Sequence, residues 1–259
     1  MRAYSTAAVV LRRINYGETD KILTLYSRDR GRFSAIAKGA RKAVSRLSGA
    51  TELLTLSKFG LAAGKSLEIV SQAEIRESFP RLRSELPRLA HAIYLADLVD
   101  HSLEDHEPNA LLYDLLVAGL YLLQRDIPPE ITARWFEVQF IQDLGYAPNY
   151  WECSICGEFV PGSFAADEIF GLSIAHGAML CPRHARPSSN SDHSALTRES
   201  IALLQTLAAL GPEEGHRLPS ITIPGSKSLN LARLALRRFI RYRMERDLKS
   251  LDFLDSLSH

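Results

Sequence analysis

Residues 7–39, AAVVLRRINYGETDKILTLYSRDRGRFSAIAKG, decide the fold of the N-terminal part. They hold three short runs in which apolar and polar residues partly alternate, separated by the polar segments INYGETD and RDRG. Such alternation is typical of strands with one buried face. Two further runs follow, ELLTLSKF at 52–59 and LEIVSQAE at 67–74. Five strands within about 75 residues, with no helix between them, predict a small closed barrel.

From Pro80 onward the apolar residues recur at helical spacing. We expect helices at 86–103, 110–124, 128–145 and 196–210, and a last one from Ser228 to Leu251. A short hairpin suits the Gly- and Phe-containing segments that follow Cys153. The sequence therefore predicts an α+β protein with four parts: a barrel at 1–79, a helical domain at 80–150, a metal-binding module at 151–190 and C-terminal helices at 191–259.

The net charge of +1 conceals an uneven distribution of charged residues. Residues 1–80 hold fourteen Lys and Arg against seven Asp and Glu, whereas residues 81–150 hold five against eleven. Residues 151–259 are balanced, with twelve of each sign. A basic block followed by an acidic block suggests separate units with different partners.

All three cysteines of the chain fall in two ligand pairs, CSIC at Cys153 and Cys156 and CPRH at Cys181 and His184. A two-residue gap lets both ligands of a pair face one ion, which is the usual way to build a tetrahedral zinc site. His176 or His193 could replace His184, but neither has the two-residue gap. Reduced thiols without a metal are the remaining interpretation.

We expect the zinc to be structural and the chain not to be an enzyme. Four protein ligands, three of them thiolates, leave no position for a reactive water. Zinc deaminases need an H-x-E element, which the sequence lacks. A nuclease needs clustered acidic ligands, and HSLEDHEP at 101–108 is better interpreted as a solvated turn between helices. Three cysteines cannot form a disulfide framework without a remainder, which favours a reducing cytoplasm, and we expect no membrane span.

The stretch RDRGRFSAIAKGARKAVSRL, residues 28–47, is strongly basic. Clustered cations on a small barrel bind nucleic acid electrostatically and with little sequence preference, although a solvated charged loop is the alternative. Gly39 permits a tight turn and a close approach of phosphate. The candidate DNA-binding residues of this stretch are Arg28, Arg30, Arg32, Lys38, Arg41, Lys42 and Arg46. Tyr16, Tyr26, Phe33 and Phe59 are candidates for base stacking or for the core.

A second basic feature lies in the expected last helix. Arg233, Arg237 and Arg241 recur at a spacing of four and form a ridge beside an apolar one made by Leu236, Ile240, Met244, Leu248 and Leu251. The apolar ridge should pack on the body of the protein. The basic ridge could then meet phosphate, unless it is an ordinary solvated helix face.

Three motifs, taken together, resemble the bacterial RecO family of recombination mediators. The family's Y-G-E-x-D element is found at 16–20, its A-K-G-A-R element at 37–41, and its F-E-x-x-x-L-x-x-x-G-Y-x-P element is recognisable at 136–148. The resemblance covers nearly the whole chain.

The resemblance implies an N-terminal OB-fold, a helical domain and an inserted zinc-ribbon-like module. It further implies binding of single- and double-stranded DNA, annealing of complementary strands, and action with RecR, in some cases also with RecF. Such proteins place RecA on strands coated by single-stranded DNA-binding protein (SSB); they are not known as enzymes. They act in the bacterial cytoplasm, at the nucleoid during repair.

Residue by residue, the family's basic positions carry over to Lys38 and Arg41, with Lys42 adjacent, and its zinc ligands to the three cysteines. The fourth ligand, commonly Cys in the family, is His184 here. Family members hold the acidic SSB tail in a largely apolar helical pocket with a basic rim, for which Arg125 and Arg134 are candidates.

Two other classes of function stay open. One is an RNA-binding adaptor, made of an OB barrel and a zinc module, that does not anneal strands. The other is a zinc-dependent hydrolase, which would need an open coordination position and a general base, for which only Glu152 and Glu158 are near the ligands in sequence.

Overall fold

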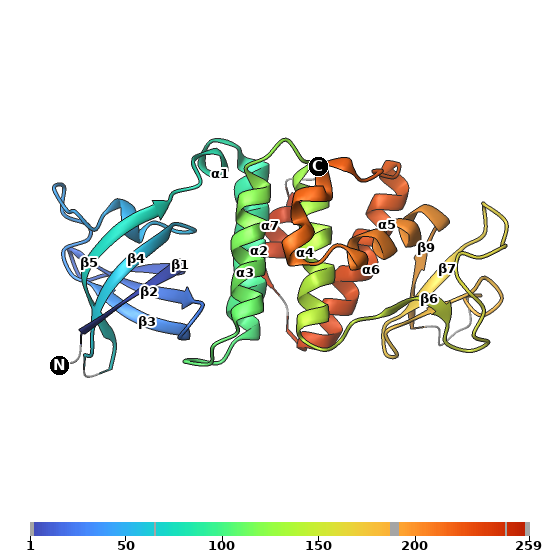
Figure 1. The fold of residues 1–259 in the computed structure, drawn as a ribbon, viewed down its shortest axis with the longest axis horizontal. Coiled ribbons are helices and arrows are strands. Elements are labelled where there is room, and N and C mark those ends of the chain that lie inside the picture. Colours follow the sequence, from blue (N-terminus) through green and yellow to red (C-terminus); the bar gives the residue numbers. More distant parts are fainter. Residues whose placement is uncertain (1–2, 65, 187–191, 247, 257–259) are drawn as a thin grey trace. The chain divides into compact units, whose positions relative to one another are not determined.

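The computed structural model describes residues 3–64, 66–186, 192–246 and 248–256 (Figure 1). The chain forms two compact units, one of residues 1–125 and 248–259 and the other of residues 126–247. The four-part division made from the sequence stays a prediction. We describe each compact unit by itself.

The first unit begins with the predicted five-stranded barrel, which is confirmed (Figure 1). The strands are β1 (Ala3–Tyr16), β2 (Asp20–Ser27), β3 (Gly31–Ala37), β4 (Leu56–Ala62) and β5 (Glu68–Glu77). Their order is β1-β2-β3-β5-β4, and β1 closes the barrel by pairing with β4. Only the β3–β5 pair is parallel among the five pairings of the barrel.

The alternation seen in the sequence places one set of side chains inside the barrel. In β3, Phe33, Ala35 and Ala37 are buried, and they pack with Leu23 and Leu25 of β2 in one apolar core. The residues between them, Arg32 among them, lie on the other side of the strand, because successive strand residues point to opposite faces.

Four helices complete the described part of the first unit, and the predictions for the two longest are confirmed. They are α1 (Pro80–Ser84), α2 (Leu86–Ser102), α3 (Ala110–Leu123) and α7 (Lys249–Ser256), with a short 3-10 turn, η1, at Gly49–Thr51. Asn109 caps α3 by accepting a hydrogen bond from the Leu112 N–H at 2.9 Å. On α7, the Ser250 hydroxyl donates to Asp97 of α2 at 2.6 Å.

Ion pairs join the barrel to α2 and α3. Asp100, which is buried on α2, accepts from both Arg12 and Arg32. Arg32 also donates to Asp105 at 2.8 Å, and Arg28 pairs with Asp114 of α3 at 3.1 Å. Part of the acidic block therefore neutralises part of the basic block within one unit, instead of serving a separate partner.

The second unit combines helices with a small sheet (Figure 1). Its elements are α4 (Pro129–Asp143), β6 (Asn149–Cys153), β7 (Phe170–Ser173), β8 (Ala178–Leu180), β9 (His193–Leu196), α5 (Arg198–Ala209), the 3-10 segment η2 (Pro212–Ser220) and α6 (Ser226–Met244). All residues of α4 from 131 to 141 are buried, so this helix is the centre of the unit. Two of its side chains donate to backbone carbonyls at the end of α5: Trp135 to Leu210 and Gln139 to Leu207.

The hairpin expected after Cys153 is the antiparallel pair β7–β8, but it belongs to a larger sheet. β6 and β9 add to its two sides in the order β6-β8-β7-β9. Sequence alternation is too short to reveal these edge strands, since β6 and β9 span five and four residues.

The expected single helix from Ser228 to Leu251 was wrong in its last third. α6 ends at Met244, where Glu245 adopts a left-handed conformation with φ of 52°, and the chain enters α7 of the first unit at Lys249. Leu248 and Leu254 are buried in that unit. The apolar ridge is therefore divided: Leu236 and Ile240 are buried on α6, but Leu248 belongs to another core.

No helix among the described residues carries an apolar stretch long enough to cross a membrane.

The shared carboxylate of Asp100 should matter more than an exposed ion pair. We expect Asp100→Asn to lower the free energy of unfolding by about 1–3 kcal/mol, because the amide removes the buried charge and one of the two oxygens that accept from Arg12 and Arg32. The matched control is Asp114→Asn, whose pair with Arg28 is exposed on both sides and should contribute less than about 1 kcal/mol. Urea unfolding followed by circular dichroism measures both, and equal losses in the two variants would contradict the prediction.

Candidate nucleic-acid interface and metal centre

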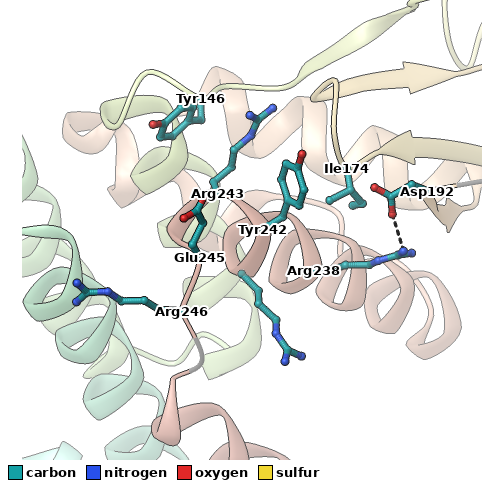
Figure 2. Close-up of a pocket in the computed structure, with 9 residues that line it drawn as sticks. Tyr146, Ile174, Asp192, Arg238, Tyr242, Arg243, Glu245 and Arg246 are labelled. Carbon is teal, nitrogen blue, oxygen red and sulfur yellow. Dashed lines mark hydrogen bonds and ion pairs between the residues drawn. The ribbon is translucent and has the colours of Figure 1, made fainter.

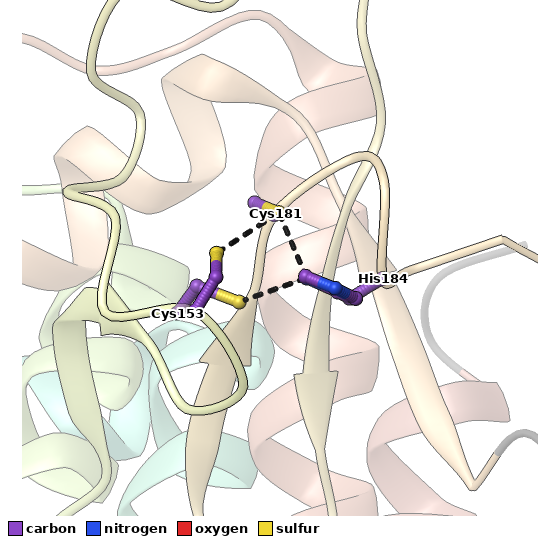
Figure 3. Close-up of side chains that lie close together, drawn as sticks. Cys153, Cys181 and His184 are labelled. Carbon is purple, nitrogen blue, oxygen red and sulfur yellow. Dashed lines mark hydrogen bonds between the residues drawn. The ribbon is translucent and has the colours of Figure 1, made fainter.

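The four predicted metal ligands lie together in the second unit (Figure 3). One ligand atom from each of Cys153, Cys156, Cys181 and His184 lies within 4.8 Å of all the others. The His184 Nδ1 is 3.5 Å from the Cys153 sulfur and 3.2 Å from the Cys181 sulfur, and the Cys156 and Cys181 sulfurs are 3.9 Å apart.

Two tight turns at neighbouring strands position these ligands. Cys153 ends β6, and Cys181 follows β8, the strand with which β6 pairs in parallel, so both pairs emerge at one end of the sheet. In the first turn, the Gly157 N–H donates to the Cys153 carbonyl at 2.8 Å, and Gly157 takes a left-handed φ of 70°. In the second, the His184 N–H donates to the Cys181 carbonyl at 2.9 Å.

The ligand set suits a tetrahedral metal ion. Zinc with Zn–S distances of about 2.3 Å and a Zn–N distance of about 2.0–2.1 Å requires ligand atoms about 3.5–3.8 Å apart, close to the separations found here. Burial raises the pKa of the Cys153 thiol, but nearby backbone N–H groups and the His184 ring outweigh it and lower that pKa to about 6. Of the three thiols that must lose a proton to bind the ion, Cys153 is thus already favoured as a thiolate. Burial, the largest cause, raises the pKa of the Cys181 thiol, so that ligand loses its proton less readily in the metal-free site.

His176 and His193 fit less well as ligands, and the surroundings of the site fit a zinc-dependent hydrolase less well than a structural ion. His193 lies on β9, where its ring packs against Gly171, and His176 is exposed. The Glu158 carboxylate lies 4.0 Å from the Cys156 sulfur and pairs with Arg183. Among the described residues, the Cys3His group is the only cluster of potential metal ligands found.

The basic turn after β3, residues 38–42, is held by the turn between β1 and β2. The Asp20 carboxylate accepts from the Gly39 N–H at 2.8 Å and from the Thr19 hydroxyl at 2.9 Å. These two hydrogen bonds, assisted by the nearby lysine cations, hold the pKa of Asp20 below its ordinary value. The Arg41 N–H donates to the Thr19 carbonyl at 2.8 Å.

This contact explains why Y-G-E-x-D and A-K-G-A-R occur together. The first element supplies the hydrogen-bond acceptors, and the second supplies the backbone N–H groups that donate to them. These bonds hold a turn in which Gly39 has a φ of 67°, in the left-handed region that glycine adopts without strain. Arg41 also donates from its side chain to the Gly17 carbonyl at 3.0 Å. The side chains of Lys38, Lys42 and Arg46 are exposed around this fixed backbone.

The arginines predicted from charge alone in residues 28–32 have partners within the first unit. Arg28 and Arg32 make the ion pairs with the helices described above. Arg30 lies over the Tyr4 ring at 4.0 Å and 3.7 Å from Glu68. Arg28 and Arg32 therefore connect the barrel to the helices, whereas Arg30 makes contacts within the barrel. A DNA-binding role for these three arginines stays a prediction.

Of the candidate stacking residues, Tyr16 alone is exposed. Tyr26, Phe33 and Phe59 are fully buried, so they belong to the core. Tyr16 ends β1 opposite Asp20, next to the basic turn.

The three arginines of α6 differ in their surroundings. Arg233 donates to Asn230 on its own helix, Arg237 is half-buried, and Arg241 is exposed near the end of the helix. Of the two arginines considered for the rim of a peptide pocket, Arg125 is exposed, but Arg134 is buried in an ion pair with Glu137 at 2.5 Å.

Comparisons with known proteins indicate the same family for the N-terminal and the C-terminal part of the chain. The model described as "Recombination protein O N terminal" matches residues 1–79, and the one described as "Recombination protein O C terminal" matches residues 83–252. The chain is 39% identical over 257 residues to the DNA repair protein RecO of Pelotomaculum thermopropionicum, covering 98% of this chain and 94% of that one. It is 37% identical over 263 residues to the protein of the same name from Heliobacterium modesticaldum, covering 99% and 91%.

The geometry selects His184 as the fourth ligand, and this can be tested. We expect His184→Ala to lower the bound metal per chain and the temperature of unfolding, because a structural ion contributes to folding free energy. His176→Ala, which removes an exposed histidine, is the control and should change neither. Metal analysis by mass spectrometry and a thermal unfolding scan measure the two effects. Full metal content in His184→Ala would contradict the assignment.

Proposed function

The chain belongs to the recombination protein O family of DNA repair and recombination proteins. On this premise we propose that it binds single- and double-stranded DNA, anneals complementary strands, and acts with RecR to load RecA onto SSB-coated single strands. The proposed activity is binding without a catalytic step, at the bacterial nucleoid.

The observation that carries the proposal is the basic turn. Lys38, Lys42 and Arg46 present exposed cations on a backbone that Asp20 fixes. A fixed backbone reduces the conformational entropy lost when phosphate binds. Contacts to phosphate carry no sequence information, so this surface suits a protein that must accept any sequence.

Annealing requires that two strands approach in spite of their charge. Cations that neutralise phosphates on both strands lower this repulsion, and because such contacts are purely electrostatic they weaken steeply with salt. Tyr16 could add stacking on an unpaired base beside the turn, since its ring is exposed.

Partners other than DNA follow from family membership. We propose RecR, the C-terminal tail of SSB and, in some cases, RecF as direct partners, with RecA as an indirect one. Arg125 is exposed and stays a candidate for the rim of the tail pocket, whereas the burial of Arg134 makes it unsuitable.

For the metal centre we propose Zn²⁺ in a structural role. Three thiolates and one imidazole from two turns close the tetrahedron and fix both turns relative to the sheet. When bound, the ion supplies cross-linking and no reactive water.

Charge reversal in the basic turn tests the DNA-binding proposal. We expect Lys38→Glu with Lys42→Glu to weaken single-strand binding at least tenfold or so, and to reduce the slope of log K against log salt by about 1.4, or 0.7 per lost phosphate contact. Arg41 is left unchanged because its side chain also supports the turn.

The matched control reverses two exposed cations on other strands, Lys58 of β4 and Arg76 of β5. It changes the net charge by the same amount and should cost less than about threefold. Fluorescence anisotropy with a labelled oligonucleotide measures both variants. If both variants lose the same affinity for the oligonucleotide, the turn is not part of the DNA site. If the wild-type protein binds RNA as tightly as DNA and does not anneal strands, an RNA-binding adaptor is favoured.

A further inference from the structure

A large open cleft lies at the C-terminal end of α6, in the second unit (Figure 2). It has a volume of about 750 Å³. Four arginines line it: Arg238, Arg241, Arg243 and Arg246. None of the functions considered above uses this cleft as a whole.

The charges that line the cleft do not cancel. Asp192 pairs with Arg238 at 2.7 Å, and Glu245 is the second carboxylate of the lining. Among the described residues of the lining, four guanidinium groups against two carboxylates give a surplus of two positive charges, which favours anions.

Two exposed tyrosines flank the arginines. Figure 2 shows Arg243 beside Tyr146, with Tyr242 between Arg243 and Ile174. The Arg243 guanidinium lies 5.3 Å from the centre of the Tyr146 ring and 5.5 Å from that of Tyr242, and it donates to the Ala175 carbonyl at 3.0 Å. Arg243 thus makes cation–π contacts with both rings. Even so, 45% of Tyr146 and 49% of Tyr242 remain exposed.

The way in which α4 ends places Tyr146 in the lining of the cleft. The Gly145 N–H donates to Gln142 at 3.0 Å and the Tyr146 N–H to Ile141 at 2.9 Å, which is the Schellman pattern of helix termination. Gly145 has a φ of 78°, which glycine adopts without strain. The G-Y pair of the third motif therefore has a physical reason: glycine ends the helix, and tyrosine enters the cleft.

Stabilisation of α6 explains only part of this arrangement. Arg241 and Arg243 lie in the last turn of the helix, where cations complement the negative end of the helix dipole. That effect requires neither exposed tyrosines nor a concave surface. The two together are what a site for single-stranded nucleic acid needs, namely cations for phosphate and ring faces for unpaired bases.

We propose that this cleft binds a short stretch of single-stranded DNA, with phosphates at Arg241 and Arg246 and a base stacked on Tyr146 or Tyr242. This inference rests on the proposed DNA-binding function and adds a second site to it, specific for unpaired strands, since the bases of a duplex present no free faces for stacking. An acidic peptide fits less well, because Ile174 is the only aliphatic residue of the described lining and offers little to anchor an apolar side chain.

The test compares a strand of about 20 thymidines with a duplex of the same length, by fluorescence anisotropy on the full chain. We expect Tyr146→Leu with Tyr242→Leu to weaken single-strand binding at least about fivefold and duplex binding by less than about twofold. The matched control is Tyr121→Leu on α3, which removes a ring of similar exposure, 43%, outside the cleft and should change neither affinity.

A charge variant covers the case in which the leucine variant folds poorly. Arg246→Gln changes one exposed side chain and should reduce the salt slope for the single strand by about 0.7. Unchanged single-strand binding in both variants, or an equal loss for strand and duplex, would overturn the proposal. So would retained strand binding together with lost binding of a labelled acidic peptide, which would assign the cleft to a peptide.

The variant with Lys38 and Lys42 reversed, measured in parallel, separates this proposal from the proposed function. If that variant loses affinity for both strand and duplex while the cleft variants bind normally, the cleft proposal fails and the barrel site stands. If the wild-type chain binds neither, the proposed function itself fails.

Discussion

The hydrogen bond from the Gly39 N–H to the Asp20 carboxylate is the contact on which the proposed DNA surface depends. It joins the β1–β2 turn to the turn after β3, and it stabilises a left-handed backbone between Lys38 and Lys42. A carboxylate this close to two lysines could neutralise them by direct pairing. Here one of its oxygens accepts from the backbone of Gly39 and from the Thr19 hydroxyl instead, and the lysine side chains extend from the turn with their exposed surface directed to solvent.

Elsewhere in the first unit, arginines of the basic block are paired with carboxylates of the same unit. Arg12 and Arg32 share the buried Asp100, and Arg28 pairs with Asp114, so these arginines connect the barrel to α2 and α3. Residues of one basic stretch thus divide into two groups: those before Phe33 make contacts within the unit, and those after Ala37 surround the exposed turn. In the second unit, α6 carries a comparable division, since Arg233 contacts Asn230 of its own helix while Arg241 lines the cleft.

The sequence predicted the features whose determinants are close together in the chain. The five strands follow from alternation, the metal ligands from two-residue gaps, and the longer helices from apolar spacing. It could not predict the partners of Arg28 and Arg32, which lie 86 and 73 positions away at Asp114 and Asp105. Nor could apolar spacing show that Leu248 packs in a different unit from Ile240, because the spacing continues unbroken through the end of α6. The Tyr146 and Arg243 cluster was missed for a similar reason, although the G-Y pair that ends α4 was visible.

On the function proposed here, sequence-independent contacts to phosphate let this protein bring complementary strands together. The most direct measurement is the annealing rate of two complementary oligonucleotides, first bare and then coated with SSB, across a salt series and without ATP. We predict acceleration that survives the coating and falls steeply as salt rises. No acceleration by folded, metal-loaded protein, or acceleration that does not change with salt, would contradict the account.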